Sequence, residues 1–356
     1  MAANPKIVVR FNFPYDPAMD ERFAREPDIA LRTCQREAAD GRIWADLAEA
    51  HVYLISSAKD ELPRQWFATA DLLARCPKLL CVSTSGAGYD TVDVDACTKA
   101  GVIVVNQAGM NAGAVAEHTL GMILSLSKRI GESDRRLRRE RGFAREEVMG
   151  CDIAGKVLGI VGIGHVGTRV ARLADAFGMT VLAYDPYVAA DEIVARGARP
   201  AALDDLLAQS DFVSVHCPRT AETLGMISER AFGRMKKGAM LVTTARGGIV
   251  DEAALYAALA SGRLGGAGVD VWDREPPPLD HPLLTLDNVI ATFHTAGVTV
   301  EARRNMAAQA AEQIVGLLKG GRPPRLVNPE ALPAYRARFE AILGLSSAAP
   351  DVLHRL

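Results

Sequence analysis

The stretch "GIVGIGHVGTRVA", Gly159 to Ala171, decides the fold that we expect for this chain. An apolar run leads into three glycines, Gly162, Gly164 and Gly167, and a helix-like pattern follows them. This spacing is typical of a turn in which a strand runs directly into the N-terminus of a dinucleotide-binding helix. The spacing alone is a weak signal, so the interpretation depends on the sequence around it.

Each glycine of this turn has its own physical role. Gly162 permits the tight turn, Gly164 lets the backbone approach a pyrophosphate, and Gly167 lets the helix pack closely on the strand. The phosphates would lie on free N–H groups at the helix start, where the helix dipole favours negative charge. Asp185 ends the next predicted strand, where its carboxylate can bind a ribose diol and repel a 2′-phosphate. The pattern predicts NAD rather than NADP, although Asp185-Pro186 could instead be a simple strand-ending turn.

Apolar runs alternate with helical segments on both sides of the turn. Four such runs precede it, at residues 6–11, 51–56, 78–84 and 102–107. Six runs include or follow its strand, at residues 157–161, 180–185, 212–216, 239–244, 267–271 and 289–292. Continuous apolar runs separated by helices predict parallel sheets that are covered on both faces. The second set has the strand number of a complete doubly wound dinucleotide fold.

The glycine turn lies nearly midway along the 356 residues, which are enough for roughly two domains. Residues 112–140 read as one or two long helices that link the halves. A helix from about Val300 that packs back on the first α/β unit would explain the late position of the turn. We therefore expect a substrate domain of residues 1–111 and 299–356, and an inserted nucleotide domain of residues 112–298. The end of the chain is Pro-rich and loosely patterned.

Composition argues against several classes of partner. The 41 basic and 43 acidic residues nearly cancel, so no global charge attracts the protein to nucleic acid or to a membrane. The locally basic segment 134–147 interleaves acids with its arginines, which favours a solvated helix face or a subunit contact. The six cysteines include no C-x-x-C pair, so we expect no metal site and a reducing, cytoplasmic location. No apolar run has the ~20 residues of a membrane span.

Three polar side chains follow later strands of the predicted nucleotide domain. Arg246, Glu275 and His294 would all lie at the carboxyl edge of one sheet, beside the glycine turn. Taken singly, each is more often an ordinary solvent or loop residue. Together they suit a reaction: arginine can hold a carboxylate by two parallel hydrogen bonds, imidazole can exchange a proton, and a carboxylate can orient and charge that imidazole.

Several segments resemble one known family, the D-isomer-specific 2-hydroxyacid dehydrogenases. The motifs that carry the resemblance are "STSGAGYDTVDVDACTKAGVIVVNQAG", "VAEH", "GIVGIGHVG", "VHCPRTAET", "ARGGIVDEAAL" and "GVDVWDREPP". The likeness runs from about Lys78 to Gly321. It implies a Rossmann-type doubly wound NAD domain inserted into a flavodoxin-like substrate domain. It also implies a homodimer that interconverts a 2-oxo acid and a D-2-hydroxy acid by hydride transfer.

The resemblance also assigns residues to roles. Arg246 would bind the substrate carboxylate, His294 would be the acid/base, and Glu275 would orient and charge it. The backbone at Ala87 and Gly88 would also contact the substrate. The implied NAD contacts are Gly162, Gly164, His165, Val166, Gly167, Asp185, Cys217, Pro218, Thr244, Ala245, Asp270, His294 and Gly297. Among these, Asp270 would receive the nicotinamide carboxamide.

The chain departs from the family pattern at two aromatic positions. Phe293 stands where the family usually has proline before its histidine, and Phe143 lies near the place of a missing tryptophan. The aromatic loop "RFNFPYDP", residues 10–17, would favour an apolar 2-oxo acid. Formate-dehydrogenase-like relatives are a rival family, but they carry glutamine in place of Glu275. A second alternative is an NAD-gated binding module, as in the C-terminal-binding-protein corepressors.

Overall fold

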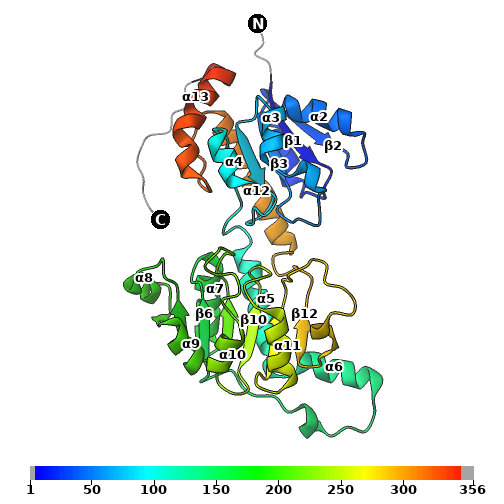
Figure 1. The fold of residues 1–356 in the computed structure, drawn as a ribbon, viewed down its shortest axis with the longest axis vertical. Coiled ribbons are helices and arrows are strands. Elements are labelled where there is room, and N and C mark those ends of the chain that lie inside the picture. Colours follow the sequence, from blue (N-terminus) through cyan, green and yellow to red (C-terminus); the bar gives the residue numbers. More distant parts are fainter. Residues whose placement is uncertain (1–4, 346–356) are drawn as a thin grey trace. The chain divides into compact units, whose positions relative to one another are not determined.

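Two parallel sheets form the framework of the chain, each in its own compact unit (Figure 1). The structure is a computed structural model that describes residues 5–345. Unit 1 contains the described residues up to Asn111 and those from Val300 onward, and unit 2 is Ala112–Thr299. Unit 2 is therefore a continuous insertion within the sequence of unit 1.

The sheet of unit 1 has five parallel strands. They are β1 (Lys6–Phe11), β2 (Ile29–Cys34), β3 (Val52–Ile55), β4 (Cys81–Thr84) and β5 (Ile103–Val105). Their order, β2-β1-β3-β4-β5, is that of the flavodoxin-like fold, as the family resemblance implies. The prediction missed β2, because this edge strand is partly exposed and mixes polar with apolar residues.

Helices cover both faces of the unit 1 sheet. They are α1 (Ala18–Phe23), α2 (Asp40–Ala48), α3 (Ala70–Arg75), α4 (Val94–Lys99), α12 (Val300–Leu318) and α13 (Leu332–Leu343), with short 3₁₀ turns at Arg64–Trp66 and Pro329–Ala331. The long helix α12 packs Ala310 and Ile314 into the core beside Val8 and Leu54 of the sheet. The loosely patterned stretch includes α13, whose Pro333 lies in the first turn, where a helix tolerates proline. The rest of that predicted tail, residues 346–356, lies outside the described residues.

The sheet of unit 2 has seven parallel strands. They are β6 (Val157–Val161), β7 (Thr180–Tyr184), β8 (Arg199–Pro200), β9 (Phe212–Val215), β10 (Met240–Thr243), β11 (Gly266–Val269) and β12 (Val289–Ala291). The order, β12-β11-β10-β9-β6-β7-β8, confirms the doubly wound prediction and places the topological switch point between β6 and β9. The strand that the sequence did not predict, β8, is an exposed pair of residues at the sheet edge.

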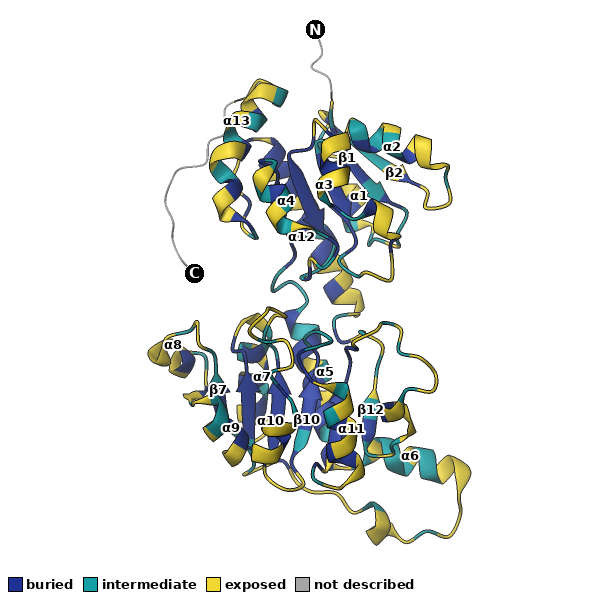
Figure 2. Cartoon of the chain, in the orientation of Figure 1, coloured by how far each residue is buried: buried dark blue, intermediate teal, exposed yellow. Residues whose placement is uncertain are grey.

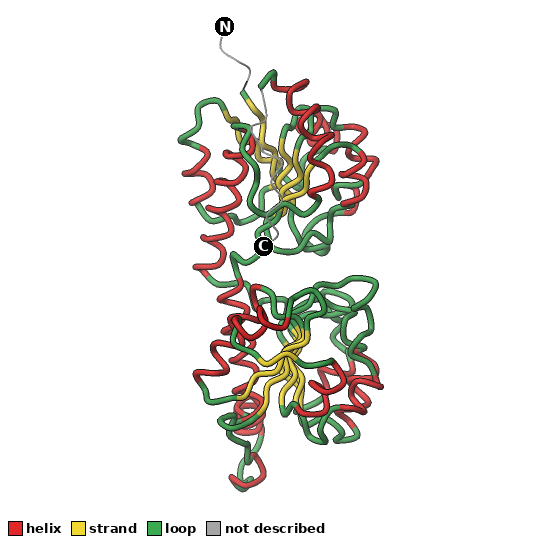
Figure 3. Tube along the Cα trace, turned by 90° about the vertical axis from the view of Figure 1, so that its left-hand side faces the viewer, coloured by secondary structure: helices red, strands yellow, loops and turns green. Residues whose placement is uncertain are grey.

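The helices of unit 2 lie on both sides of its sheet, which Figure 3 shows in side view. They are α5 (Ala112–Ser127), α6 (Ile130–Arg139), α7 (His165–Ala176), α8 (Ala190–Ala195), α9 (Leu203–Gln209), α10 (Glu229–Arg234) and α11 (Glu252–Ala260), with 3₁₀ turns at Arg145–Val148 and Pro282–Thr285. The predicted helical stretch 112–140 is thus two helices, divided where Arg129 adopts a left-handed conformation (φ 51°).

Burial explains why the strands read as continuous apolar runs. The central strands of both sheets are buried on both faces, whereas the outer faces of the helices are exposed (Figure 2). In unit 2 one face packs around Leu241 and Val213, and the other packs around Leu158 and Ile160. No helix in the described part of the chain is both long enough and apolar enough to cross a membrane.

Candidate functional site

The glycine turn joins β6 to α7 at the switch point of the unit 2 sheet. Gly162 has φ +92°, and a Cβ there would lie 2.6 Å from the backbone nitrogen of Cys217, which follows β9. A Cβ on Gly167 would overlap the carbonyl oxygen of Gly162. A Cβ on Gly164, in contrast, would meet nothing within 4 Å among the described residues. Two of the glycines are therefore required by the protein's own packing, whereas the third leaves its backbone open to a ligand.

The start of α7 has the features of an anion site. Its N-cap, Gly164, supplies no side-chain hydrogen bond, and the first bond of the helix runs from the Thr168 N–H to the Gly164 carbonyl. The N–H groups before Thr168, including those of His165 and Val166, have no partner within the helix. Asp185 accepts a hydrogen bond from the Ile163 N–H (3.0 Å), so its carboxylate lies directly beside the turn. These features fit the NAD pyrophosphate and ribose.

The different surroundings of Gly164 and Gly167 give a matched test of this turn. Gly164→Ala should leave the melting temperature nearly unchanged but weaken NADH binding by about tenfold, because the methyl group would occupy the open face. Gly167→Ala should destabilise the fold by about 1–3 kcal/mol, because its methyl group would overlap backbone. Thermal unfolding and NADH titration of both variants separate the two effects. Unchanged NADH affinity in Gly164→Ala would contradict this assignment of the turn.

Unit 2 brings the predicted imidazole and carboxylate together. Nδ1 of His294 lies 2.9 Å from Oε2 of Glu275, and both side chains are only partly exposed. The other oxygen of Glu275 accepts a hydrogen bond from the Trp272 N–H (3.1 Å). The buried indole of Trp272 in turn donates from Nε1 to the Thr292 carbonyl (2.9 Å), two residues before His294. Through Trp272, hydrogen bonds therefore link the loop that carries Glu275 to the loop that carries His294.

The electrostatics of Glu275 favour its ionised form. Burial acts to raise the pKa of this carboxyl, but the hydrogen bond and charge of His294, the Trp272 N–H and the charge of Arg246 outweigh burial and hold the pKa below its ordinary value. Glu275 is therefore a carboxylate at neutral pH. Its contribution to stability is complete above its ordinary pKa and is lost only as the pH falls through the lowered value.

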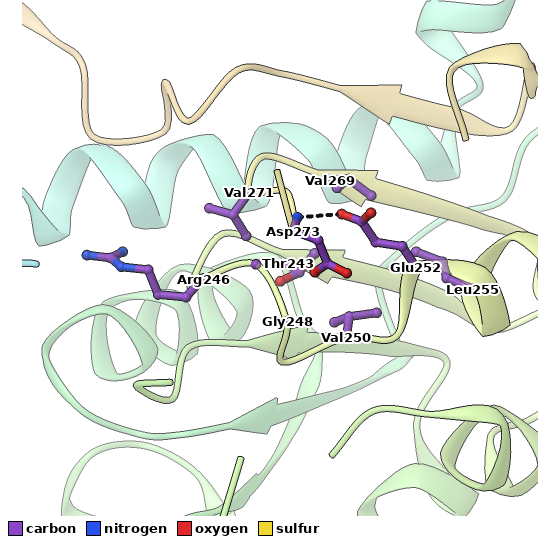
Figure 4. A pocket seen from close by; sticks show the side chains of 10 residues that line it. Thr243, Arg246, Gly248, Val250, Glu252, Leu255, Val269, Val271 and Asp273 are labelled. Atoms are coloured by element: carbon purple, nitrogen blue, oxygen red, sulfur yellow. Dashed lines mark hydrogen bonds between the residues drawn. The ribbon is translucent and has the colours of Figure 1, made fainter. Parts of the chain in front are cut away.

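Arg246 lies in the loop after β10 and is half-buried. One of its guanidinium nitrogens donates to the Ala245 carbonyl (2.7 Å). Figure 4 shows the side chain extending away from the contact between Glu252 and Asp273. The cavity behind this loop has a volume of about 10 Å³, which is enough for a single water and far too small for a substrate.

Glu252, at the start of α11, supports the loop that carries Glu275. Its Oε1 accepts a hydrogen bond from the Asp273 N–H (2.8 Å), drawn in Figure 4. Its Oε2 lies 3.0 Å from Nε2 of His281, whose Nδ1 accepts from the Leu283 N–H. Because Nδ1 is an acceptor, Nε2 carries the proton and donates to Glu252. Glu252 lies within the motif "ARGGIVDEAAL" and His281 lies outside the quoted motifs, and the sequence alone gave neither residue a role.

Thr244, another predicted NAD contact, belongs to a buried polar chain. Its hydroxyl lies 3.2 Å from the hydroxyl of Thr119 and 3.5 Å from Nδ1 of His216. Nε2 of His216 is 2.7 Å from the Ser214 hydroxyl. Burial lowers the pKa of His216 to about 3, so this imidazole is neutral at physiological pH. The chain links α5 to the ends of β9 and β10.

The remaining predicted residues divide between the two units. Asp270 and Gly297 lie in unit 2, near the His294 loop. Separately, the described residues contain no group of three or more His, Cys, Asp or Glu side chains that could hold a metal ion. Ala87 and Gly88 lie in unit 1, in the loop after β4, where the Asn106 amide donates to the Ala87 carbonyl (2.8 Å). Their contact with substrate stays a prediction.

The two aromatic departures from the family pattern have different surroundings. The Phe293 side chain is 47% exposed. Phe143 packs under the Arg136 guanidinium, which lies 4.4 Å from the ring centroid. Neither ring is part of the buried core of unit 2.

Known proteins with similar sequences match most of the chain. A glyoxylate reductase from Korarchaeum cryptofilum is 40% identical over 274 residues, which make up 76% of this chain and 82% of that protein. A D-3-phosphoglycerate dehydrogenase from Archaeoglobus fulgidus is 42% identical over 251 residues, which make up 70% of this chain and 47% of that protein. The chain therefore spans about half the length of the D-3-phosphoglycerate dehydrogenases that it matches.

Solved structures match over nearly the whole chain. A glyoxylate reductase from Paecilomyes thermophila superposes with a TM-score of 0.80 at 26% identity, covering 93% of this chain and 99% of that one. A D-lactate dehydrogenase from Aquifex aeolicus, solved with NAD and lactic acid, gives a TM-score of 0.77 at 29% identity, covering 90% and 98%.

A family model described as "D-isomer specific 2-hydroxyacid dehydrogenase, NAD binding domain" matches residues 120–296, which lie within unit 2. This match agrees with the doubly wound sheet and with the open glycine turn at its switch point. The chain belongs to the family of D-isomer-specific 2-hydroxyacid dehydrogenases.

Proposed function

We propose that this protein is an NAD-dependent oxidoreductase that interconverts a 2-oxo acid and a D-2-hydroxy acid. The observation that carries the proposal is the His294–Glu275 pair, 2.9 Å apart, together with the charge of Arg246 acting on the same carboxylate. A guanidinium, an imidazole and a carboxylate are the groups that reduction of a 2-oxo acid requires. Family membership adds independent support.

His294 would move the proton of the reaction. Bound NADH supplies the hydride that reaches C2 of the 2-oxo acid. Nε2 of His294 would donate a proton to the carbonyl oxygen at the same time, which yields the alcohol, and would accept that proton in the oxidation direction. Glu275 accepts a hydrogen bond from Nδ1 and so fixes the orientation of the ring.

Arg246 would bind the substrate through its carboxylate. The planar guanidinium can form two parallel charge-assisted hydrogen bonds to the carboxylate oxygens. This contact would orient C2 and polarise the adjacent carbonyl. The backbone of Ala87 and Gly88 would supply further substrate contacts, and the glycine turn, Asp185 and the loop at Cys217 and Pro218 would hold NAD.

A spectrophotometric panel tests the proposal. Glyoxylate, hydroxypyruvate, pyruvate, phenylpyruvate and branched 2-oxo acids are each supplied with NADH and with NADPH. We expect oxidation of NADH with at least one acid, and weaker use of NADPH because the Asp185 carboxylate repels a 2′-phosphate. Tight NADH binding without turnover across the panel would overturn the enzymatic proposal and favour an NAD-gated binding module.

We also infer that the protein forms a homodimer through unit 2. Helix α6 has no buried residue, and the arm formed by residues 130–149 has three large exposed apolar side chains, Ile130, Leu137 and Met149. Exposed apolar side chains gathered on one arm are typical of a subunit contact. Sedimentation equilibrium should give twice the mass of one chain, and Leu137→Glu should reduce it to that of a monomer. A monomeric wild-type chain would contradict this inference.

A further inference from the structure

The backbone at His294 adopts an unusual conformation. Its φ is +48°, and among the described residues only Arg129 and His294 have positive φ without being glycine. Residues with a side chain rarely adopt this left-handed conformation because of steric crowding. It is kept only where surrounding contacts hold the backbone in place. The conformation therefore indicates that specific contacts fix the loop after β12.

Asp270 ties the loop on both sides of His294. This carboxylate is fully buried, and its Oδ1 accepts from the Thr292 hydroxyl (2.6 Å) and the Thr295 N–H (2.8 Å). Its Oδ2 accepts from the Ala296 N–H (3.1 Å). The backbone carbonyl of Asp270 accepts from the N–H of His294 itself (2.6 Å). One residue at the end of β11 therefore holds the residues on either side of His294.

His118 extends this network to helix α5. Its Nε2 lies 3.2 Å from the Thr292 hydroxyl oxygen and 3.9 Å from Oδ1 of Asp270. The Thr292 hydroxyl has one proton, which it gives to Asp270, so its oxygen is left to accept the Nε2 proton of His118. The chain of donors thus runs from His118 through Thr292 to Asp270. It anchors the loop to a helix that packs against the same sheet.

We propose that His118 and Thr292 are positioning residues for His294. They hold the Asp270 carboxylate in the orientation that binds the Thr295 and Ala296 N–H groups, and that keeps His294 in its left-handed conformation against Glu275. Neither side chain is assigned a contact with substrate or NAD. This inference rests on the proposed function, in which the imidazole of His294 is the acid/base of the reaction.

The test uses His118 and Thr292 rather than Asp270, because Asp270 is also a predicted NAD contact. Thr292→Val removes the hydroxyl at nearly constant shape, and Thr292→Ser restores it. His118→Phe removes the donor, and His118→Gln restores an N–H donor near the position of Nε2. Each disruptive variant thus has a conservative partner.

Two measurements are made on the full-length variants. In the protein without NAD, hydrogen–deuterium exchange of the Thr295 and Ala296 amides should be about tenfold faster in Thr292→Val and His118→Phe, while β12 exchanges as before. In steady-state kinetics, kcat should fall about tenfold with the substrate KM and NADH affinity within about twofold. Thr292→Ser and His118→Gln should recover most of both effects. The double disruptive variant should lose no more than the worse single variant, because both act through one chain.

The outcomes separate this inference from the proposed function. Wild-type protein without turnover on any 2-oxo acid would contradict the proposed function, while amide exchange would still decide whether His118 and Thr292 hold the loop. Unchanged exchange in both disruptive variants overturns the inference. Faster exchange with unchanged kcat in an active enzyme also overturns it, as do additive losses in the double variant.

Discussion

Replacing His294 by glutamine should lower kcat by about 10²–10⁴-fold while NADH binds nearly as tightly as before. Glutamine can keep a hydrogen bond to Glu275, but it cannot donate and recover a proton at pH 7. The 2.9 Å contact between Nδ1 and Glu275 leaves Nε2 as the nitrogen available to a substrate oxygen. Stopped-flow single-turnover rates and an NADH titration would measure the two quantities separately.

Glu275→Gln is the matched control for this prediction. It keeps the size of the side chain and removes the negative charge, so it should lower kcat less than His294→Gln does. Turnover in His294→Gln within about threefold of wild type would show that another group moves the proton, because acid–base catalysis contributes far more than that.

Removing the Arg246 side chain has the second largest expected effect. Arg246→Ala should raise the substrate KM, lower kcat, and reduce kcat/KM by at least about 100-fold, since two charge-assisted hydrogen bonds are worth about 1.5–3 kcal/mol each. It would also remove a positive charge that helps to keep Glu275 ionised. Initial rates over a wide range of 2-oxo acid concentration would give both constants.

Arg246→Lys separates charge from shape. Lysine keeps the positive charge but cannot form two parallel bonds to a carboxylate, so its kcat/KM should fall between those of wild type and Arg246→Ala. An unchanged KM in Arg246→Ala would show that the carboxylate binds elsewhere. Equal activity of the lysine variant and wild type would show that only the charge matters.

The sequence predicted the framework well, because burial on both faces leaves a clear pattern. Central strands such as β6 and β9 are continuous apolar runs, and the glycine spacing marked the switch point between them. The strands that escaped prediction, β2 and β8, lie at sheet edges, where exposure mixes polar residues into the pattern. Helix α13 escaped because proline and weak periodicity hid its two buried aromatic residues, Tyr335 and Phe339.

Residue types and strand ends were enough to predict that His294 and Glu275 lie together, but not which other groups hold them there. Arg246, Glu275 and His294 follow successive strands, and the structure pairs the last two directly. Asp270 was predicted as an NAD contact, yet its oxygens accept three hydrogen bonds from the His294 loop, and its contact with NAD stays a prediction. These contacts depend on how the loop after β12 packs against the end of β11, and the spacing of residues in the sequence does not give that packing. His118 stood in a recognised motif, but only the structure gives it a partner.

The insertion of unit 2 within unit 1 affects the order in which the two units fold during synthesis. All of unit 2 leaves the ribosome before α12 does, so its sheet can complete its core while unit 1 still lacks a helix. Until Ala310, Ile314 and Leu317 arrive, the face of the first sheet around Val8 and Leu54 is only partly covered, by Met19 and Phe23 of α1. A nascent chain that has released Thr299 but not α12 from the ribosome would therefore hold one complete domain and one incomplete domain with exposed apolar surface, which is the kind of species that chaperones bind.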